Sequence, residues 1–421
     1  MSLGSYWRLI RHNRNFRLLW MAQIVSELGD WFYSITIFSF LLELTGSAQM
    51  VALAFLMQVL PQCLAAPTAG VLNDRLSRKQ LMILADLARA GIVFSMMFVR
   101  SRGSLWLLFV LLFLETLGFA LFEPGRNAVV PNIAAAEDIP AANALGATTW
   151  SVNFAIGAAL GGLVNVSLGR TAVFVLNSMS FLASAFLIQR MRFAEPHLEN
   201  VTPLRAKDLF DFSPIVDGFR YIWRDSRLLA TIFVKGGVGL MGANWVILPL
   251  LGRNVFPARL AGLSREQAGT LGMSLLMAAR GVGAIFGAVL GGLYAGTDAL
   301  RLRRTILVGF LMGAAGYVAL GSAGSFAMAF LAVGVAHMGG STAWTSSTTL
   351  IYQRTEDRFL GRVSSAEFAL CMLTLAGSSF AAGRYSDMGV SIRVIAAVTG
   401  VVMVAPALVW IGARRVWKST G

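Results

Sequence analysis

The chain has 421 residues, of which 56% are apolar and only 13% are charged, and its mean hydropathy is +0.68. These values exclude a soluble globular domain and indicate an integral membrane protein. The net charge of +14 would suit a protein that binds nucleic acid. Most Lys and Arg residues, however, fall on one side of the membrane once the apolar runs are placed, so no nucleic-acid partner is expected.

Apolar runs of roughly 20 residues, the length that crosses the hydrocarbon core, recur along the whole chain. They are continuous and rich in Leu, Ala, Gly, Phe and Met, whereas a transmembrane barrel would show short alternating segments. The sequence therefore predicts an all-α membrane protein with twelve transmembrane helices. We place them near 16–42, 48–72, 80–100, 104–124, 141–166, 171–190, 228–251, 267–295, 304–321, 325–350, 362–384 and 391–413.

The first apolar run follows a basic segment that contains Arg8, Arg11, Arg14 and Arg17. It lacks a small-residue cleavage site and continues past the length of a signal-peptide core, so it is predicted to be a retained first span. The bias of Lys and Arg to alternate loops predicts that both termini face the cytoplasm. We expect a multi-pass protein of the plasma (inner) membrane.

The longest polar stretch divides the chain near its middle. It predicts a cytoplasmic linker over 191–227, between an N-terminal six-helix half at 1–190 and a C-terminal six-helix half at 228–421. The halves also echo one another, since LGDWF at 28–32 matches GANWV at 242–246. Two parallel repeats of this kind are typical of transporters.

The stretch GVLNDRLSRK joins the second and third predicted spans. It contains Gly70, Asp74, Arg75, Arg78 and Lys79. The carboxylate of Asp74 needs a positive partner, and the N-terminus of another helix would serve because its N–H groups attract anions. For Arg78 and Lys79, an equally good explanation is that they only enforce the topology.

With twelve spans and a central basic linker, this G-x-x-x-D-R-x-x-R-K pattern resembles the signature of the major facilitator superfamily, and the resemblance covers the whole chain. Within it, the chain is most similar to the drug/proton antiporter branch that holds macrolide exporters, siderophore exporters and lysophospholipid transporters. The segments that carry this similarity are 15–31, 122–133 and 354–365.

The resemblance implies a monomer of two pseudo-symmetric halves that needs no cofactor and works by alternating access. It further implies that Asp74 docks at the start of helix 11, near Arg362 to Ser365, and locks the outward-facing state. One motif departs from the antiporter pattern: GAALGG at 157–162 has Ala158 where a proline is expected. This helix should be less kinked, while its glycines, like those spaced four apart at 283–291, favour close helix packing.

Ionisable side chains inside the membrane are candidates for function because they are costly there. Glu27 and Asp30 lie three apart on the first span, and close or desolvated carboxylates have a raised proton affinity. Both are candidates for proton coupling, the alternative being ion pairs with neighbouring helices. His337 is a further candidate because imidazole exchanges protons near neutral pH. A packed, hydrogen-bonded histidine is the alternative.

Glu115 lies midway along the fourth span and is also a candidate for proton coupling. Its alternative is an ion pair with Arg89 or with Arg280. Asp86 and Arg89 are expected to pair with each other, since they lie three apart on one helix. Arg280 is a candidate for binding an anionic substrate group, or for a structural ion pair.

Lys235 is expected to extend its ammonium to the cytoplasmic interface, and Glu367 to belong to the gate near Asp74. Aromatic side chains in the cavity-lining spans favour an amphipathic or lipophilic substrate over a sugar. The candidate substrate contacts are Trp31, Phe154, Trp245, Trp344 and the cation Arg280.

The resemblance implies a proton-coupled exporter, with protons, membrane lipids and a small amphipathic molecule as partners. A lysophospholipid flippase of the same fold, without obligatory proton coupling, remains the alternative. No HExxH, GxSxG or GxxxxGK[ST] motif indicates an enzyme or an ATPase. Cys63 and Cys371 lie in separate spans with no metal-like spacing, so no metal site or disulfide is expected.

Overall fold

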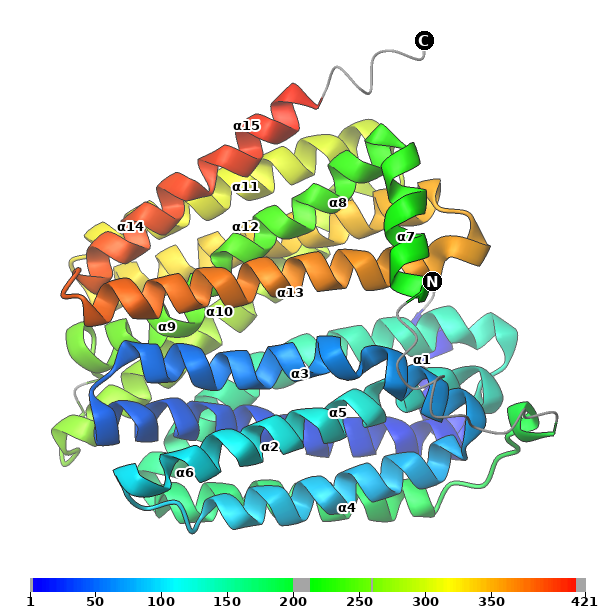
Figure 1. The fold of residues 1–421 in the computed structure, drawn as a ribbon, viewed down its shortest axis with the longest axis horizontal. Helices are drawn as coiled ribbons and strands as arrows, with labels where there is room; N and C mark the ends of the chain where they lie inside the picture. Colours follow the sequence, from blue (N-terminus) through cyan, green and yellow to red (C-terminus); the bar gives the residue numbers. More distant parts are fainter. Residues whose placement is uncertain (1–2, 200–212, 259, 414–421) are drawn as a thin grey trace. The chain divides into compact units, whose positions relative to one another are not determined.

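The computed structural model describes residues 3–199, 213–258 and 260–413, which form helices joined by short turns (Figure 1). The chain divides into two compact units. Unit 1 comprises Met1–Ile37 and Met57–Asp211, and unit 2 comprises Phe38–Leu56 and Phe212–Gly421. The central part of the predicted linker, 200–212, lies outside the described residues.

Unit 1 contains most of the first six long helices. These are α1 (Leu3–His12), α2 (Arg14–Thr45), α3 (Ala48–Arg75), α4 (Arg78–Met96), α5 (Leu105–Ile133) and α6 (Ile139–Gln189). The tips of α2 and α3 that meet at Gly46 belong to unit 2. The long α6 is interrupted at Gly169, whose φ of 80° is readily adopted by glycine. One span ends at this residue and the next begins after it.

Unit 2 contains the remaining helices. They are α7 (Ser213–Arg224), α8 (Ser226–Gly239), η5 (Leu240–Ala243), α9 (Asn244–Leu250), η6 (Leu251–Val255), α10 (Arg265–Ala295), α11 (Ala299–Ser322), α12 (Phe326–Arg354), α13 (Asp357–Asp387), α14 (Ile392–Val402) and α15 (Val404–Gly412). One predicted span is thus built from α8, η5, α9 and η6 in succession, and the last from α14 and α15 (Figure 1).

The helices confirm the predicted spans. In the described part of the chain, nine helical segments are long and apolar enough to cross a membrane. One of these is α6, which contains two spans, and α2 and α4 add two more that carry the charged residues of the site below. Twelve crossings follow.

Side chains at the helix starts satisfy the N–H groups that have no partner within the helix. Ser77 caps α4, Asp225 caps α8 and Asp298 caps α11 by accepting hydrogen bonds from backbone N–H groups two or three positions on. Ser264 and Gln267 form a reciprocal capping box at the start of α10. Short polar loops can therefore begin each helix abruptly.

Glycines hold α10 against α12 at close distance. A Cβ at Gly283 or Gly287 would overlap the backbone of α12, and one at Gly291 would lie 2.9 Å from Thr342. The Thr342 hydroxyl also donates to the carbonyl of Gly287 at 2.9 Å. The predicted contact surface of these regularly spaced glycines is confirmed.

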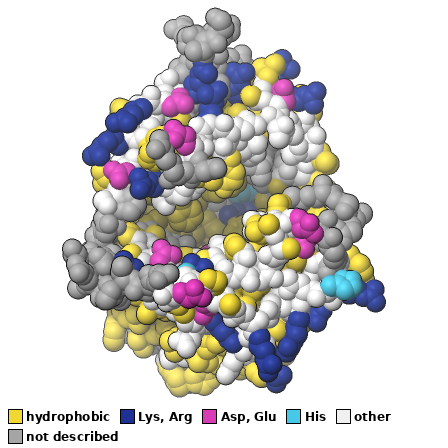
Figure 2. Space-filling view, turned by 90° about the vertical axis from the view of Figure 1, so that its right-hand side faces the viewer, with side chains coloured by type: hydrophobic (Ala, Val, Ile, Leu, Met, Phe, Trp, Pro, Cys, Tyr) yellow, Lys and Arg dark blue, Asp and Glu magenta, His cyan; other side chains and the backbone are white. Residues whose placement is uncertain are grey.

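The surface of both units suits a membrane environment. Large apolar side chains such as Leu293 and Leu373 are 79% and 67% exposed. An aqueous surface rarely carries so many exposed apolar side chains, so these face lipid. Figure 2 shows groups of Lys and Arg side chains around the helix ends at the right of Figure 1, where α3 ends at Arg75 and α4 begins at Arg78.

Candidate transport site

A buried charged centre lies in unit 1, around Arg89 of α4. The Arg89 guanidinium contacts Asp30 of α2 at 2.7 Å and Glu115 of α5 at 2.8 Å. Its third acidic neighbour is Asp86, one helical turn away, at 3.5 Å. One cation thus joins carboxylates from three helices, and the pairing of Asp86 with Arg89 is confirmed.

The surroundings of this centre exclude water on most sides. The side chain of Arg89 is 1% exposed and its guanidinium lies 4.0 Å from the ring centroid of Phe181. Tyr33 donates to the second oxygen of Glu115 at 2.8 Å. Gly118 leaves room for the arginine, since a Cβ there would lie 2.7 Å from the Arg89 side chain.

Asp30 is the most accessible member of the centre. Its side chain is 20% exposed, compared with 5% for Glu115 and 0% for Asp86. Its Oδ2 binds Arg89, whereas its Oδ1 accepts no hydrogen bond within the part of the chain that the structure describes. With all groups ionised, three carboxylates would face a single guanidinium and would carry a net negative charge. Binding a proton on one of the carboxylates would reduce this repulsion.

Glu27 belongs to a second, separate network in unit 1. It accepts hydrogen bonds from Gln23 at 2.8 Å and from Asn153 at 3.0 Å, and it is 8% exposed. The side-chain amide oxygen of Gln23 in turn accepts from Arg126 at 3.0 Å, and Arg126 pairs with Glu123. Glu27 and Asp30, although close in sequence, therefore have different partners.

Aromatic rings meet where α2 packs on α6. Trp31 contacts Phe154 edge to face at 4.4 Å and Trp150 at 5.7 Å. Glycines permit this close approach, because a Cβ at Gly157 would lie 2.7 Å from the Cβ of Trp31. Within α6, Gly169 is the residue with non-helical backbone angles, so the segment around Ala158 continues as a helix, as its lack of proline predicted.

Unit 2 has its own buried ion pair. The Lys235 ammonium on α8 contacts Glu367 of α13 at 2.6 Å and Thr348 of α12 at 2.7 Å. It also lies 3.5 Å from the ring centroid of Trp344. Lys235 is 0% exposed, so the expectation that it reaches the membrane surface is wrong. The acceptors that replace water are Glu367, Thr348 and the backbone carbonyl of Trp344, at 3.3 Å. Glu367 is therefore the ion-pair partner of Lys235.

Arg280 and His337 have separate contacts in the same unit. The guanidinium of Arg280 lies 4.2 Å from the ring centroid of Trp245. Trp245 also stacks on Phe55 with a centroid distance of 4.5 Å. His337 shares a hydrogen bond of 3.0 Å with Tyr317. Of the two ion-pair partners predicted as alternatives for Glu115, Arg89 is the one that the structure shows.

The predicted gate residues of the α3–α4 turn differ in how firmly they are held, with Asp74 exposed and the basic residues bonded to backbone carbonyls. Asp74 is 74% exposed and lies 3.7 Å from Arg78. Arg78 also donates to the carbonyl of Ala128 at 3.0 Å, and Lys79 donates to the carbonyl of Met191 at 2.7 Å. A Cβ at Gly70 would meet no neighbour within 4 Å. The basic residues therefore fasten the α3–α4 turn to unit 1.

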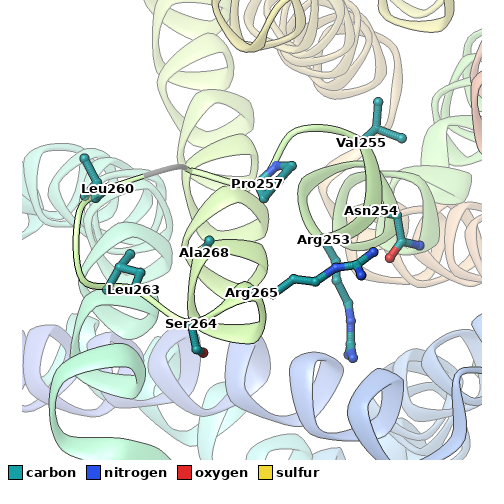
Figure 3. A pocket seen from close by; sticks show the side chains of 9 residues that line it. All are labelled: Arg253, Asn254, Val255, Pro257, Leu260, Leu263, Ser264, Arg265 and Ala268. Carbon is teal, nitrogen blue, oxygen red and sulfur yellow. The ribbon is translucent and has the colours of Figure 1, made fainter.

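Arg362, the predicted partner region of Asp74, contacts α7 in unit 2. Its guanidinium lies 3.6 Å from Asp217, and Gly218 packs directly on its backbone. A pocket in the same unit lies between η6 and the start of α10 (Figure 3) and includes Arg253 and Arg265. It contains none of the predicted site residues.

Several members of these networks were not predicted as site residues. They are Gln23, Tyr33, Glu123, Arg126, Asn153 and Thr348. Arg89 was expected only as an ion-pair partner, although a lone arginine within an apolar run is itself a sign of a buried site. Glu123 and Arg126 lie three apart in a segment similar to known transporters, which is the signal that was available for them.

Twelve crossings in two units, each with a buried ion pair, describe a helical membrane protein that crosses the bilayer many times. A family model described as "Transmembrane secretion effector" matches residues 5–419. The chain therefore belongs to this family of the major facilitator superfamily.

Comparison with individual proteins agrees with this family. The chain is 27% identical over 194 residues to macrolide efflux protein A of Streptococcus pyogenes, covering 46% of this chain and 47% of that protein. It is 28% identical over 190 residues to the putative bacilysin exporter BacE of Bacillus subtilis, covering 44% and 46%. Each match thus spans about half the length of the relative.

A solved structure shows the same fold. The crystal structure of a POT family transporter in complex with 5-aminolevulinic acid matches with a TM-score of 0.75 and 12% sequence identity. The match covers 97% of both chains. The fold of that protein is therefore present over nearly the whole chain.

Proposed function

We propose that this protein exports a small amphipathic or lipophilic molecule in exchange for protons, by alternating access. The centre formed by Asp30, Arg89, Glu115 and Asp86 carries this proposal. An antiporter needs a group that binds a proton in one state and releases it in another, and Asp30 has both a buried cation beside it and a free acceptor oxygen.

In the proposed cycle, a proton and the Arg89 guanidinium compete for the carboxylate of Asp30. While Asp30 is ionised, its Oδ2 holds Arg89. A proton on Asp30 would weaken this ion pair, and Arg89 would keep Glu115 and Asp86 as partners. Arg89 can therefore remain charged through the cycle, and the α2 contact is the one that changes. Glu27, Glu115 and His337 are further proton-binding candidates, and each shares a hydrogen bond with a neutral side chain.

The aromatic groups support an amphipathic substrate. In unit 1, the partly exposed ring of Trp31 packs on the buried Phe154 and provides apolar contact surface without fixed hydrogen-bond demands. In unit 2, Trp245 lies against Arg280 and Trp344 lies against the buried Lys235, so each of these rings is paired with a cation. The names of relatives that export macrolides or bacilysin agree with a substrate of this kind.

The proposal includes a cellular orientation and a gate. The Lys and Arg groups at one end of the helices support a cytoplasmic position for that end and for both termini, in the bacterial plasma membrane. In the outward-facing state, Asp74 would dock at the start of α13 near Arg362, where helix N–H groups attract a carboxylate. We propose a monomer, since each unit carries its own charged centre.

The test is substrate-driven proton movement in proteoliposomes with a pH-sensitive dye inside. The panel comprises macrolides, bacilysin, lipophilic cations, siderophores and lysophospholipids, and protein-free liposomes are the control. We expect at least one compound to drive proton movement only in the presence of the protein. If lysophospholipid crosses without any proton signal, and no other compound moves, the protein is a flippase and the antiporter proposal fails.

A further inference from the structure

The last residue of α13, Asp387, caps the first turn of α3, although the two lie far apart in the sequence. The Asp387 carboxylate accepts hydrogen bonds from the backbone N–H groups of Ala48 at 2.7 Å and Gln49 at 3.1 Å. It also accepts one from the hydroxyl of Ser47, 340 positions away. All four residues belong to unit 2.

The contact between the Asp387 carboxylate and the start of α3 combines hydrogen bonds with a favourable helix dipole. The first N–H groups of a helix have no partner within the helix, and a carboxylate near them is stabilised by the helix dipole. The usual N-cap is a neighbour in sequence. Here the Ser47 hydroxyl accepts a long hydrogen bond of 3.3 Å from the backbone N–H of Met50 and donates its own hydrogen bond to Asp387, so a distant helix supplies the main cap.

The surrounding packing shows that the whole 38–56 hairpin is docked in unit 2. One turn before Asp387, a Cβ at Gly383 would lie 2.9 Å from Ala52, so α13 and α3 touch closely. On the α2 side, Ser39 shares a hydrogen bond of 2.6 Å with Thr270 of α10. Its carbonyl accepts from Arg253 at 3.2 Å.

We propose that Asp387 is a conformational latch that holds the α2–α3 hairpin on unit 2. Both helices continue from this hairpin into unit 1, at Ile37 and Met57. This inference rests on the proposed alternating access: when unit 1 rearranges, the hairpin is either released from unit 2 or restrains the two helices, and Asp387 sets how readily it is released. Asp387 lies at the C-terminal end of α13 as Asp74 lies at that of α3, so each helix ends with an acid suited to cap another.

The test measures how often the hairpin lifts, and it is independent of substrate and of proton coupling. Thr270 is 6% exposed and bonded to Ser39, so a cysteine there should react with a maleimide only when the hairpin moves away. Thr270→Cys is made in a background with Cys63→Ala and Cys371→Ala, which removes the native thiols. Purified protein is labelled in detergent, where both ends of the helices are accessible.

Adding Asp387→Ala, which removes every acceptor oxygen of the cap, should raise the labelling rate by about 2- to 30-fold, the range expected for losing a helix cap. Ser47→Ala, which keeps the carboxylate, should give a smaller rise. Asp298→Ala is the matched control, because Asp298 caps α11 from within its own loop. An unchanged labelling rate in Asp387→Ala, or an equal rise in Asp298→Ala, would contradict the proposed latch.

Discussion

Replacing Arg89 with methionine is expected to destabilise the protein by about 3–5 kcal/mol, the usual result of breaking a buried ion pair by removing one partner. The side chain is 1% exposed and contacts Asp30, Glu115 and Asp86. Without the guanidinium, these carboxylates must take up protons or admit water. Unfolding of the purified protein in detergent, followed by heat or SDS titration, measures the loss.

The control and the rescue separate charge pairing from general damage. Arg100→Met replaces an exposed arginine and should change stability by less than about 1 kcal/mol. Adding Asp30→Asn and Glu115→Gln to Arg89→Met should recover a substantial part of the loss, because fewer buried charges then lack a partner. Wild-type stability in Arg89→Met would mean that this centre does not hold the helices together.

Lys235→Met is expected to have an effect of similar size in unit 2. The ammonium is 0% exposed, and its loss leaves Glu367, which is only 9% exposed, without its cation. About 3–5 kcal/mol of stability should be lost, and the double variant Lys235→Met with Glu367→Gln should recover much of it. The same unfolding measurement applies.

An exposed pair in the same unit provides the comparison. Arg220 and Asp217 contact each other at 3.2 Å, with side chains 66% and 41% exposed. Because water screens such a pair, Arg220→Ala should cost less than about 1 kcal/mol. Equal losses in Lys235→Met and Arg220→Ala would contradict the argument that burial makes the Lys235 pair strong.

Hydropathy predicted the spans well because each must match the thickness of the bilayer. The predicted ranges 141–166 and 171–190 fall on either side of Gly169, where the structure interrupts α6. What hydropathy could not show is that one span is assembled from α8, η5, α9 and η6. That irregularity arises from tertiary packing of Gly239 and Gly242 against α13.

The site was predicted in part. Lone charges within apolar runs marked Asp30, Glu115 and Arg89, but sequence spacing alone left Glu115 with two possible partners. The three-residue spacing correctly paired Asp86 with Arg89, since both lie on one helix. Lys235 was predicted wrongly because its partner Glu367 lies 132 positions away on α13, and a distant acceptor leaves no local pattern.

The central claim is that Asp30 couples transport to protons. In proteoliposomes, Asp30→Asn should retain exchange of labelled for unlabelled substrate, which needs no net proton movement, and should lose accumulation driven by a pH gradient. Glu27→Gln, in the separate Gln23 network, and Asp298→Asn should keep both activities. Accumulation at the wild-type rate by Asp30→Asn would contradict the account, and its loss in Glu27→Gln instead would move the proton site to Glu27.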